Sequence, residues 1–66
     1  MSNEKPSIGS LWQEKNTHNV HRVIRIFVDN SSPGTELIGY LEVESGEYHV
    51  RFASDWNEDF TRLVFF

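Results

Sequence analysis

The sequence predicts an all-β protein: a small five-stranded antiparallel sheet that curls into a partly open barrel, with one helical turn before the last strand. Three observations predict it. Segments rich in β-branched and aromatic residues alternate with turn-forming segments. The chain has 66 residues, which suits one domain. Aromatic residues make up 14% of the chain, and a flat sheet would leave much of their surface exposed to solvent. We therefore expect the sheet to bend around them.

The N-terminal part divides into a tail and a first strand. Residues 1–7 are polar and are expected to form a flexible tail, because nothing in them can bury surface, whereas residues 8–66 form the single domain. Residues 8–15 contain a glycine for a bend and then an apolar pair, which favours a short first strand. Residues 16–19 are turn formers by composition.

The segment from Val20 to Asp29 is the strongest strand, since β-branched and aromatic residues dominate it. Apolar residues fall on both of its faces, which predicts a strand that curves through the fold with the core on one side and partial cover on the other. Residues 30–35 follow, and their Pro-Gly dipeptide marks a loop.

Two alternating strands, Leu37 to Glu44 and Glu47 to Ala53, flank Ser45-Gly46 and predict a hairpin with a two-residue turn. In that register Val43 lies opposite Tyr48, and a slip of one residue would mix the apolar and polar faces. The face assigned to the core carries Leu41, Val43, Tyr48, Val50 and Phe52. The face assigned to water carries Tyr40, Glu42, Glu44, Glu47, His49 and Arg51.

After the hairpin, residues 54–59 begin with a serine suited to cap a helix and continue with acidic residues. This pattern favours one turn of α-helix or 3₁₀-helix. Asp55, Glu58 and Asp59 could form a carboxylate pair for acid–base chemistry, but stabilising the start of a helical turn is the simpler interpretation. Residues 61–66 return to strand composition.

Two resemblances follow. The order of strands and one helical turn resembles the small barrels of the Src-homology-3 and Tudor group, which host many functions. The segments Gly9-Ser10-Leu11-Trp12, Val20-His21-Arg22-Val23 and Phe60-Thr61-Arg62-Leu63 resemble short proteins common in phage and prophage genomes, with a Gly-x-x-aromatic start and a Phe-x-Arg-aliphatic end. This second resemblance implies an origin in a phage rather than an activity.

Composition indicates a cytoplasmic protein. The chain has no cysteine, so nothing argues for an oxidising compartment or a thiolate metal site. No apolar run approaches the roughly 20 residues of a membrane span, and residues 1–6 lack the apolar segment of a signal peptide. We therefore expect no membrane association.

The residues predict neither an enzyme nor a cofactor. His18, His21 and His49 invite a zinc interpretation, but residues three apart on a strand face opposite ways, so we interpret these histidines as surface residues. The chain lacks the Gly-x-Ser-x-Gly elbow of a serine hydrolase. No catalytic site and no metal site are therefore predicted.

Two kinds of partner stay open. A nucleic acid could stack on Tyr40 or Trp12 beside the arginines, although the formal net charge of −4 opposes binding to phosphates. A protein fits better, because an interface with aromatic and arginine anchors inside a charged rim is typical of protein binding. The predicted binding residues are Trp12, Tyr40, Glu42, His49, Arg51, Phe65 and Phe66.

The sequence therefore predicts a non-enzymatic protein-binding module, an adaptor or an inhibitor of a host protein if the origin is a phage. The alternative is a nucleic-acid-binding barrel. The edges of the sheet, notably the C-terminal strand, could pair with a partner's strand. Phe65-Phe66 cannot both face one side of a strand, which makes a homodimer contact one of two interpretations, a core plug being the other.

Overall fold

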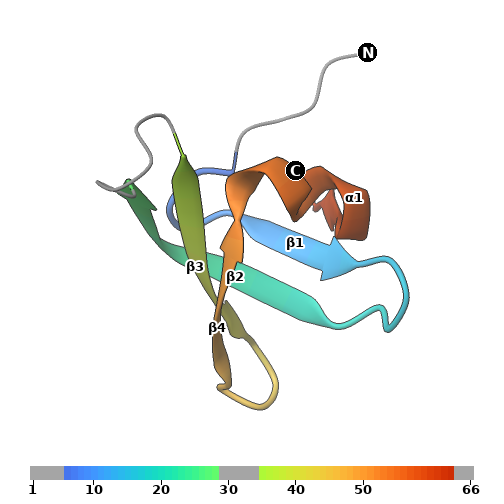
Figure 1. Ribbon diagram of the computed structural model, residues 1–66. Coiled ribbons are helices and arrows are strands. Elements are labelled where there is room, and N and C mark those ends of the chain that lie inside the picture. The colour runs from blue at the N-terminus through green and yellow to red at the C-terminus, as the bar shows by residue number, and fades with distance from the viewer. Residues whose placement is uncertain (1–5, 29–34, 64–66) are drawn as a thin grey trace.

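The computed structural model describes residues 6–28 and 35–63, which form one antiparallel sheet of five strands (Figure 1). The strands are β1 (Leu11–Glu14), β2 (Val20–Val28), β3 (Glu36–Glu42), β4 (Tyr48–Phe52) and β5 (Phe60–Arg62). Their order in the sheet is β4-β3-β2-β1-β5, so the last strand returns beside the first. The strands β4 and β5 remain as edges. The prediction of an all-β, partly open five-stranded sheet is confirmed.

A short helical segment precedes β5, as the sequence predicted. It consists of a 3₁₀ turn, η1 (Ala53–Asp55), followed by α1 (Trp56–Asp59). The backbone N–H of Lys15, just after β1, donates to the carbonyl oxygen of Asp59 at 2.8 Å. This bond ties the end of the helical turn to the start of the sheet, where β5 begins.

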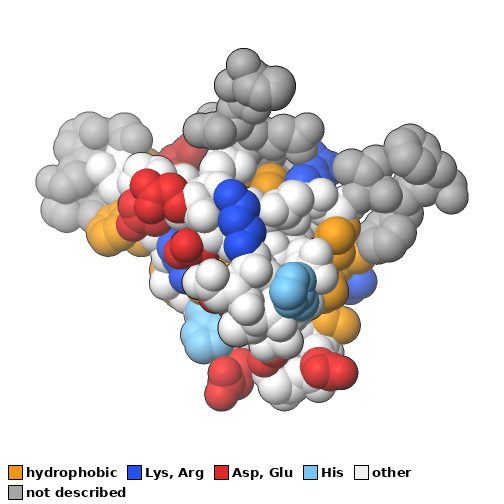
Figure 2. Space-filling view, turned by 90° about the vertical axis from the view of Figure 1, so that its right-hand side faces the viewer, with side chains coloured by type: hydrophobic (Ala, Val, Ile, Leu, Met, Phe, Trp, Pro, Cys, Tyr) orange, Lys and Arg blue, Asp and Glu red, His pale blue; other side chains and the backbone are white. Residues whose placement is uncertain are grey.

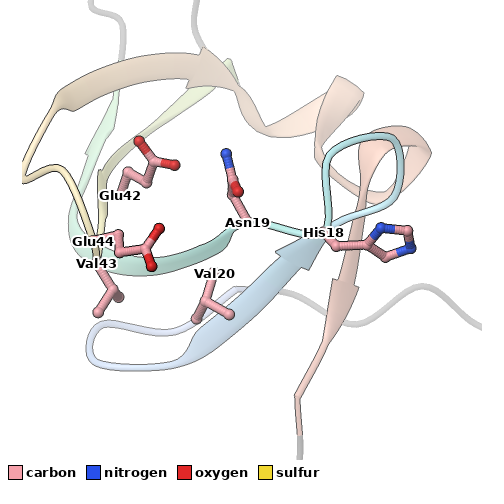
Figure 3. Close-up of a pocket in the computed structure, with 6 residues that line it drawn as sticks. All are labelled: His18, Asn19, Val20, Glu42, Val43 and Glu44. Atoms are coloured by element: carbon pink, nitrogen blue, oxygen red, sulfur yellow. The ribbon is translucent and has the colours of Figure 1, made fainter.

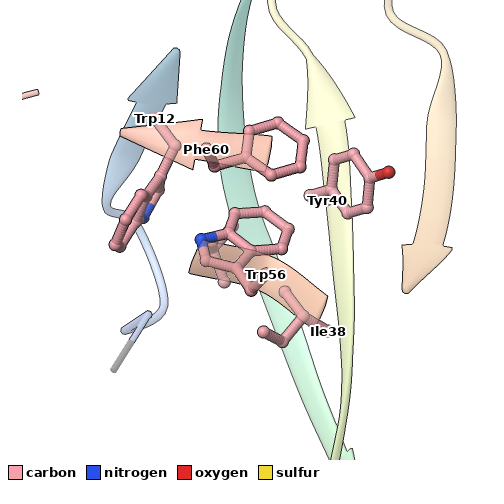
Figure 4. Close-up of a cluster of buried hydrophobic side chains, with 6 residues drawn as sticks. Trp12, Ile38, Tyr40, Trp56 and Phe60 are labelled. Carbon is pink, nitrogen blue, oxygen red and sulfur yellow. The ribbon is translucent and has the colours of Figure 1, made fainter. Parts of the chain in front are cut away.

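An aromatic core lies on one side of the sheet (Figure 4). Trp56 is fully buried and stacks on Phe60 with ring centroids 4.2 Å apart. Its ring also meets the edges of Tyr40 and Trp12, at centroid distances of 5.0 Å and 5.6 Å. The cluster consists of Trp12, Val23, Ile38, Tyr40, Trp56 and Phe60. We call the side of the sheet that carries this cluster the inner face.

The long strand β2 contains an irregularity that explains its mixed apolar pattern. Its register with β3 shifts between Val23 and Arg25, which leaves Ile24 as an extra residue. Before the shift Val23 points into the core, and after it Ile26 lies opposite Ile38. A β-bulge of this kind bends a strand and changes which residues face each side. The predicted curvature of this strand therefore has a defined cause.

The β3–β4 hairpin differs from the prediction by two residues. Leu41, not Val43, lies opposite Tyr48. The loop is closed by the N–H of Gly46, which donates to the carbonyl oxygen of Glu42 at 2.8 Å, and Gly46 has a φ of +78°. The predicted two-residue turn is wrong. Because side chains alternate with a period of two, a shift of two residues leaves both faces unchanged, and the pattern does not distinguish the registers.

The choice of buried face is also opposite to the prediction. Tyr40 is only 6% exposed, whereas Tyr48, Val50 and Phe52 are 49%, 50% and 48% exposed. Both faces of the hairpin carry apolar residues, because Ile38 lies on the same side as Tyr40. The helical turn packs against that side through Trp56, and this packing decides which face is buried.

Candidate binding surface

Two residues expected to bind a partner belong to the core instead. Trp12 is 1% exposed, and its Nε1 donates to the Ser10 hydroxyl at 2.8 Å. Tyr40, on β3, is buried beneath the helical turn, where its ring contacts Trp56. The exposed position predicted for Tyr40 is therefore wrong, and Trp12 is buried as well. The other aromatic candidates, Phe65 and Phe66, lie outside the described residues.

His21 was interpreted as a surface residue, and that interpretation is wrong too. Its side chain is 5% exposed and lies edge-on to the rings of Tyr40 and Phe60, at centroid distances of 5.4 Å and 5.2 Å. It points inward because it lies opposite Trp12, on the inner face. His21 therefore extends the aromatic core across β2.

Arg51 connects the edge strand β4 to the helical turn. Its guanidinium forms an ion pair with Asp59, and its Cζ lies 5.0 Å from the centroid of the Phe60 ring. Its Nε donates to the Tyr40 hydroxyl at 3.4 Å. Burial lowers the pKa of Arg51, but hydrogen bonds to Tyr40 and Asp59 outweigh it, and the pKa is raised overall. The Arg51 guanidinium therefore makes its contacts with residues of its own chain, on the inner face.

The two remaining candidates make local contacts beside the β3–β4 loop. The ring of exposed His49 packs against the Tyr40 ring, with centroids 5.6 Å apart, and its Nε2 lies 3.2 Å from Glu47 Oε1. The Glu42 carboxylate accepts a hydrogen bond from the Ser45 hydroxyl. Both contacts are at or near the surface, where such pairs contribute little to stability.

A hollow of about 360 Å³ lies between the β1–β2 loop and the β3–β4 loop (Figure 3). It is lined by His18, Asn19, Val20, Glu42, Val43 and Glu44. The Glu42 and Glu44 side chains lie on one side of Asn19, and the His18 ring turns away on the other (Figure 3). Within residues 6–28 and 35–63, no group of three or more His, Cys, Asp or Glu is placed to hold a metal ion. We therefore assign no chemistry to this hollow.

The most distinctive surface is the side of the sheet opposite the core. We call it the outer face and define it by side-chain alternation along β2, β3 and β4. Its members are Arg22, Ile24, Arg25, Phe27, Leu37, Leu41, Tyr48, Val50 and Phe52. Each is exposed or half-buried, so three adjacent strands present apolar side chains to solvent.

The charges on the outer face have one sign. Arg22 and Arg25 are its only ionisable groups apart from the Tyr48 phenol. The described acidic residues lie elsewhere, on the inner side of the strands, in the β3–β4 loop and in the helical segment. Figure 2 shows another side of the molecule, where acidic and basic side chains are interspersed and hydrophobic ones appear mainly toward the margins. An acidic protein thus has one face that is apolar and basic.

Comparison with known proteins finds no match among protein-family models, among curated proteins or among solved structures. Within the described part of the chain, no helix is long and apolar enough to cross a membrane.

Proposed function

We propose that the chain is a non-enzymatic protein-binding module and that its outer face contacts the partner. The observation that carries the proposal is the exposure of Tyr48, Val50 and Phe52, each about half open to solvent on one side of one strand. Monomeric proteins rarely expose large contiguous apolar patches, and those that do commonly use them for binding. The core of a protein interface is enriched in aromatic residues and arginine and depleted of Lys, Asp and Glu.

The two arginines indicate the chemistry of the partner. The Arg25 Cζ lies 5.8 Å from the centroid of the Phe27 ring, and Arg22 lies opposite Leu41. Guanidinium groups beside apolar side chains can form bidentate pairs with carboxylates while the apolar groups pack. The partner segment we propose carries acidic residues among apolar ones. If the chain originates in a phage, we propose that it acts as an adaptor or as an inhibitor of a host protein.

Binding to single-stranded nucleic acid is the second candidate. The observation in its favour is that Arg22 and Arg25 share a face with Phe27 and Tyr48, because bases stack on exposed aromatic rings beside arginine. Phosphate contacts supply most of the affinity in such complexes, and two arginines on a chain with a net charge of −4 supply few of them. The aliphatic side chains of the outer face also favour a protein over a nucleic acid as the partner.

The test uses the tagged chain in lysates with and without nuclease treatment. We expect the wild type to retain a specific protein after nuclease treatment and the outer-face variants Leu41→Asp and Arg22→Gln to lose it. Val28→Asp, a substitution of an exposed aliphatic residue at the inner side of β2, is the control and should retain the protein. Circular dichroism confirms that each variant is folded.

Two outcomes would contradict the proposal. Recovery of a ligand only without nuclease, with an affinity that falls steeply with salt, would identify nucleic acid as the ligand. Equal retention of one protein by the wild type and by both outer-face variants would show that a different surface binds it.

A further inference from the structure

The free edge of β4 exposes main-chain hydrogen-bonding groups in a defined pattern. The Glu42 N–H donates to the Glu47 carbonyl oxygen at 2.8 Å, and antiparallel pairing alternates from there. His49 therefore directs its main-chain groups toward β3, whereas Tyr48, Val50 and Phe52 direct theirs away from the sheet. Within residues 6–28 and 35–63, β4 pairs only with β3, so the outward groups have no partner strand. The Phe52 carbonyl oxygen differs from the others, because Phe52 is the N-cap of η1 and its carbonyl accepts the first hydrogen bond of that turn.

Of the features that normally prevent strand pairing, this edge has only an inward-pointing charge, which is paired with Asp59. Natural sheet edges are protected by lysine, proline, bulges or inward-pointing charges. β4 consists of Tyr, His, Val, Arg and Phe, and it pairs with β3 without a register shift. Its only permanent charge belongs to Arg51, which is turned to the inner face and paired with Asp59. The outward positions Tyr48, Val50 and Phe52 are all about half exposed.

The edge is complementary to itself. If two β4 strands pair antiparallel with Val50 opposite Val50, then Tyr48 of each copy lies opposite Phe52 of the other. In this register all three outward-directed residues form pairs, and the Val50 pair exchanges two main-chain hydrogen bonds. In the Tyr48–Phe52 pairs, the Phe52 carbonyl oxygen also accepts a bond within η1 and is therefore shared. A shift of two residues in either direction would lose one of these pairs. The side chains in the junction are apolar on the outer face, and opposed aromatic and β-branched residues stabilise antiparallel pairs.

Charge also permits this pairing. On the inner face His49 of one copy lies opposite Arg51 of the other, whose charge is already matched by Asp59. A dimer formed by stacking two outer faces would instead place Arg22 and Arg25 of both copies in one apolar interface with no carboxylate on that face. Edge pairing avoids this cost.

We propose that a second copy of the chain occupies the β4 edge and that the protein is a two-fold symmetric homodimer with one continuous sheet. Directly opposed residues of an antiparallel pair share a face, so the outer faces of both copies lie on the same side. The dimer thereby doubles the apolar and basic surface. This inference does not depend on the identity of any other partner.

The first measurement is the mass of the purified full chain as a function of concentration, by sedimentation equilibrium. We expect the mass to rise from 7.7 kDa toward twice that value. Amide hydrogen exchange then locates the contact. Exchange at Tyr48, Val50 and Phe52 should slow as concentration rises, whereas the amides of His49 and Arg51, which bond to β3, should be protected at every concentration.

Two variants test the contact. Val50→Lys places two ammonium groups opposite each other at the symmetry axis and should raise the dimer dissociation constant at least about tenfold. Val50→Pro removes an N–H that makes no hydrogen bond to β3, and it should also raise the dimer dissociation constant. Val43→Lys, at a similarly exposed valine in the loop, is the matched control and should leave the constant unchanged.

The proposal is overturned by a wild-type mass of 7.7 kDa at the highest concentration the chain tolerates. A dimer in which the three outward amides exchange freely would also overturn it, since the contact would lie elsewhere. The failure of this proposal is distinguishable from that of the binding function, because only the latter depends on Leu41 and Arg22.

Discussion

The ring of Tyr48 on β4 lies across Gly39 on β3, at the centre of the outer face. A Cβ atom at Gly39 would collide with the Tyr48 hydroxyl and would lie 3.0 Å from Cζ. Gly39 is opposite Val50, so the ring reaches diagonally over the position where the side chain is missing. An aromatic side chain that covers a strand glycine shields its backbone from water and compensates for the weak strand propensity of glycine.

Gly39→Ala is expected to destabilise the fold by about 1 kcal/mol, because the Tyr48 ring must leave its position. In a Tyr48→Ala background the same change should become neutral or slightly stabilising, since the clash is gone and alanine reduces the entropy of the unfolded chain. Urea unfolding of the two single variants and the double variant measures this coupling. Equal cost in both backgrounds would contradict the contact.

Gly46 provides the control for that cycle. Its φ of +78° lies in the left-handed region, and nothing stands within 4 Å of a Cβ added there. Gly46→Ala should therefore cost about 1 kcal/mol through backbone strain, and Tyr48→Ala should not change that cost.

The buried and exposed aromatic residues should differ sharply in their contribution to stability. Trp56→Ala removes a fully buried ring and is expected to cost about 3 to 5 kcal/mol, enough to unfold much of so small a domain. Phe52→Ala removes a half-exposed ring and should cost about 1 kcal/mol or less at concentrations where the chain is monomeric. Thermal unfolding by circular dichroism compares the two. Similar costs would contradict the difference in burial between the two rings.

Ser10→Ala tests a buried polar contact. The Ser10 hydroxyl accepts from Trp12 Nε1 at 2.8 Å and donates to the carbonyl oxygen of Ser7. Its removal leaves the Trp12 N–H buried without this acceptor, which should cost about 1 to 3 kcal/mol. In a Trp12→Phe background the cost should be smaller, because the N–H is absent. Urea unfolding provides the measurement, and an unchanged cost in that background would exclude this bond as the cause.

Arg51 should contribute more than its ion pair does. Asp59→Asn removes a partly exposed pair and is expected to cost less than about 1 kcal/mol, with a smaller cost at high salt. Arg51→Ala also removes the packing of the guanidinium on the Phe60 ring and should cost about 1 to 2 kcal/mol. Unfolding at low and high salt separates the two contributions. Identical salt-dependent costs would show that the ion pair alone acts.

Local patterns predicted the elements of this fold well. The β-branched run from Val20 predicted β2, and the acidic segment after the hairpin predicted the helical turn. These signals depend on neighbouring residues in the chain, through turn propensity, alternation and helix capping. The candidate binding residues were predicted less well, because Trp12 and Tyr40 are core residues. Their aromatic character is equally consistent with an interface and with a core.

The sequence by itself determined the strands, the helical turn and which residues of the hairpin share a face. Only the tertiary structure decided the hairpin register and which face is buried, since a pattern with a period of two is the same after a shift of two residues. The burial of Tyr40 and Ile38 depends on Trp56 and Phe60, which arrive from a later part of the chain and cover one side of the sheet. That long-range packing leaves Tyr48, Val50 and Phe52 on the outer face.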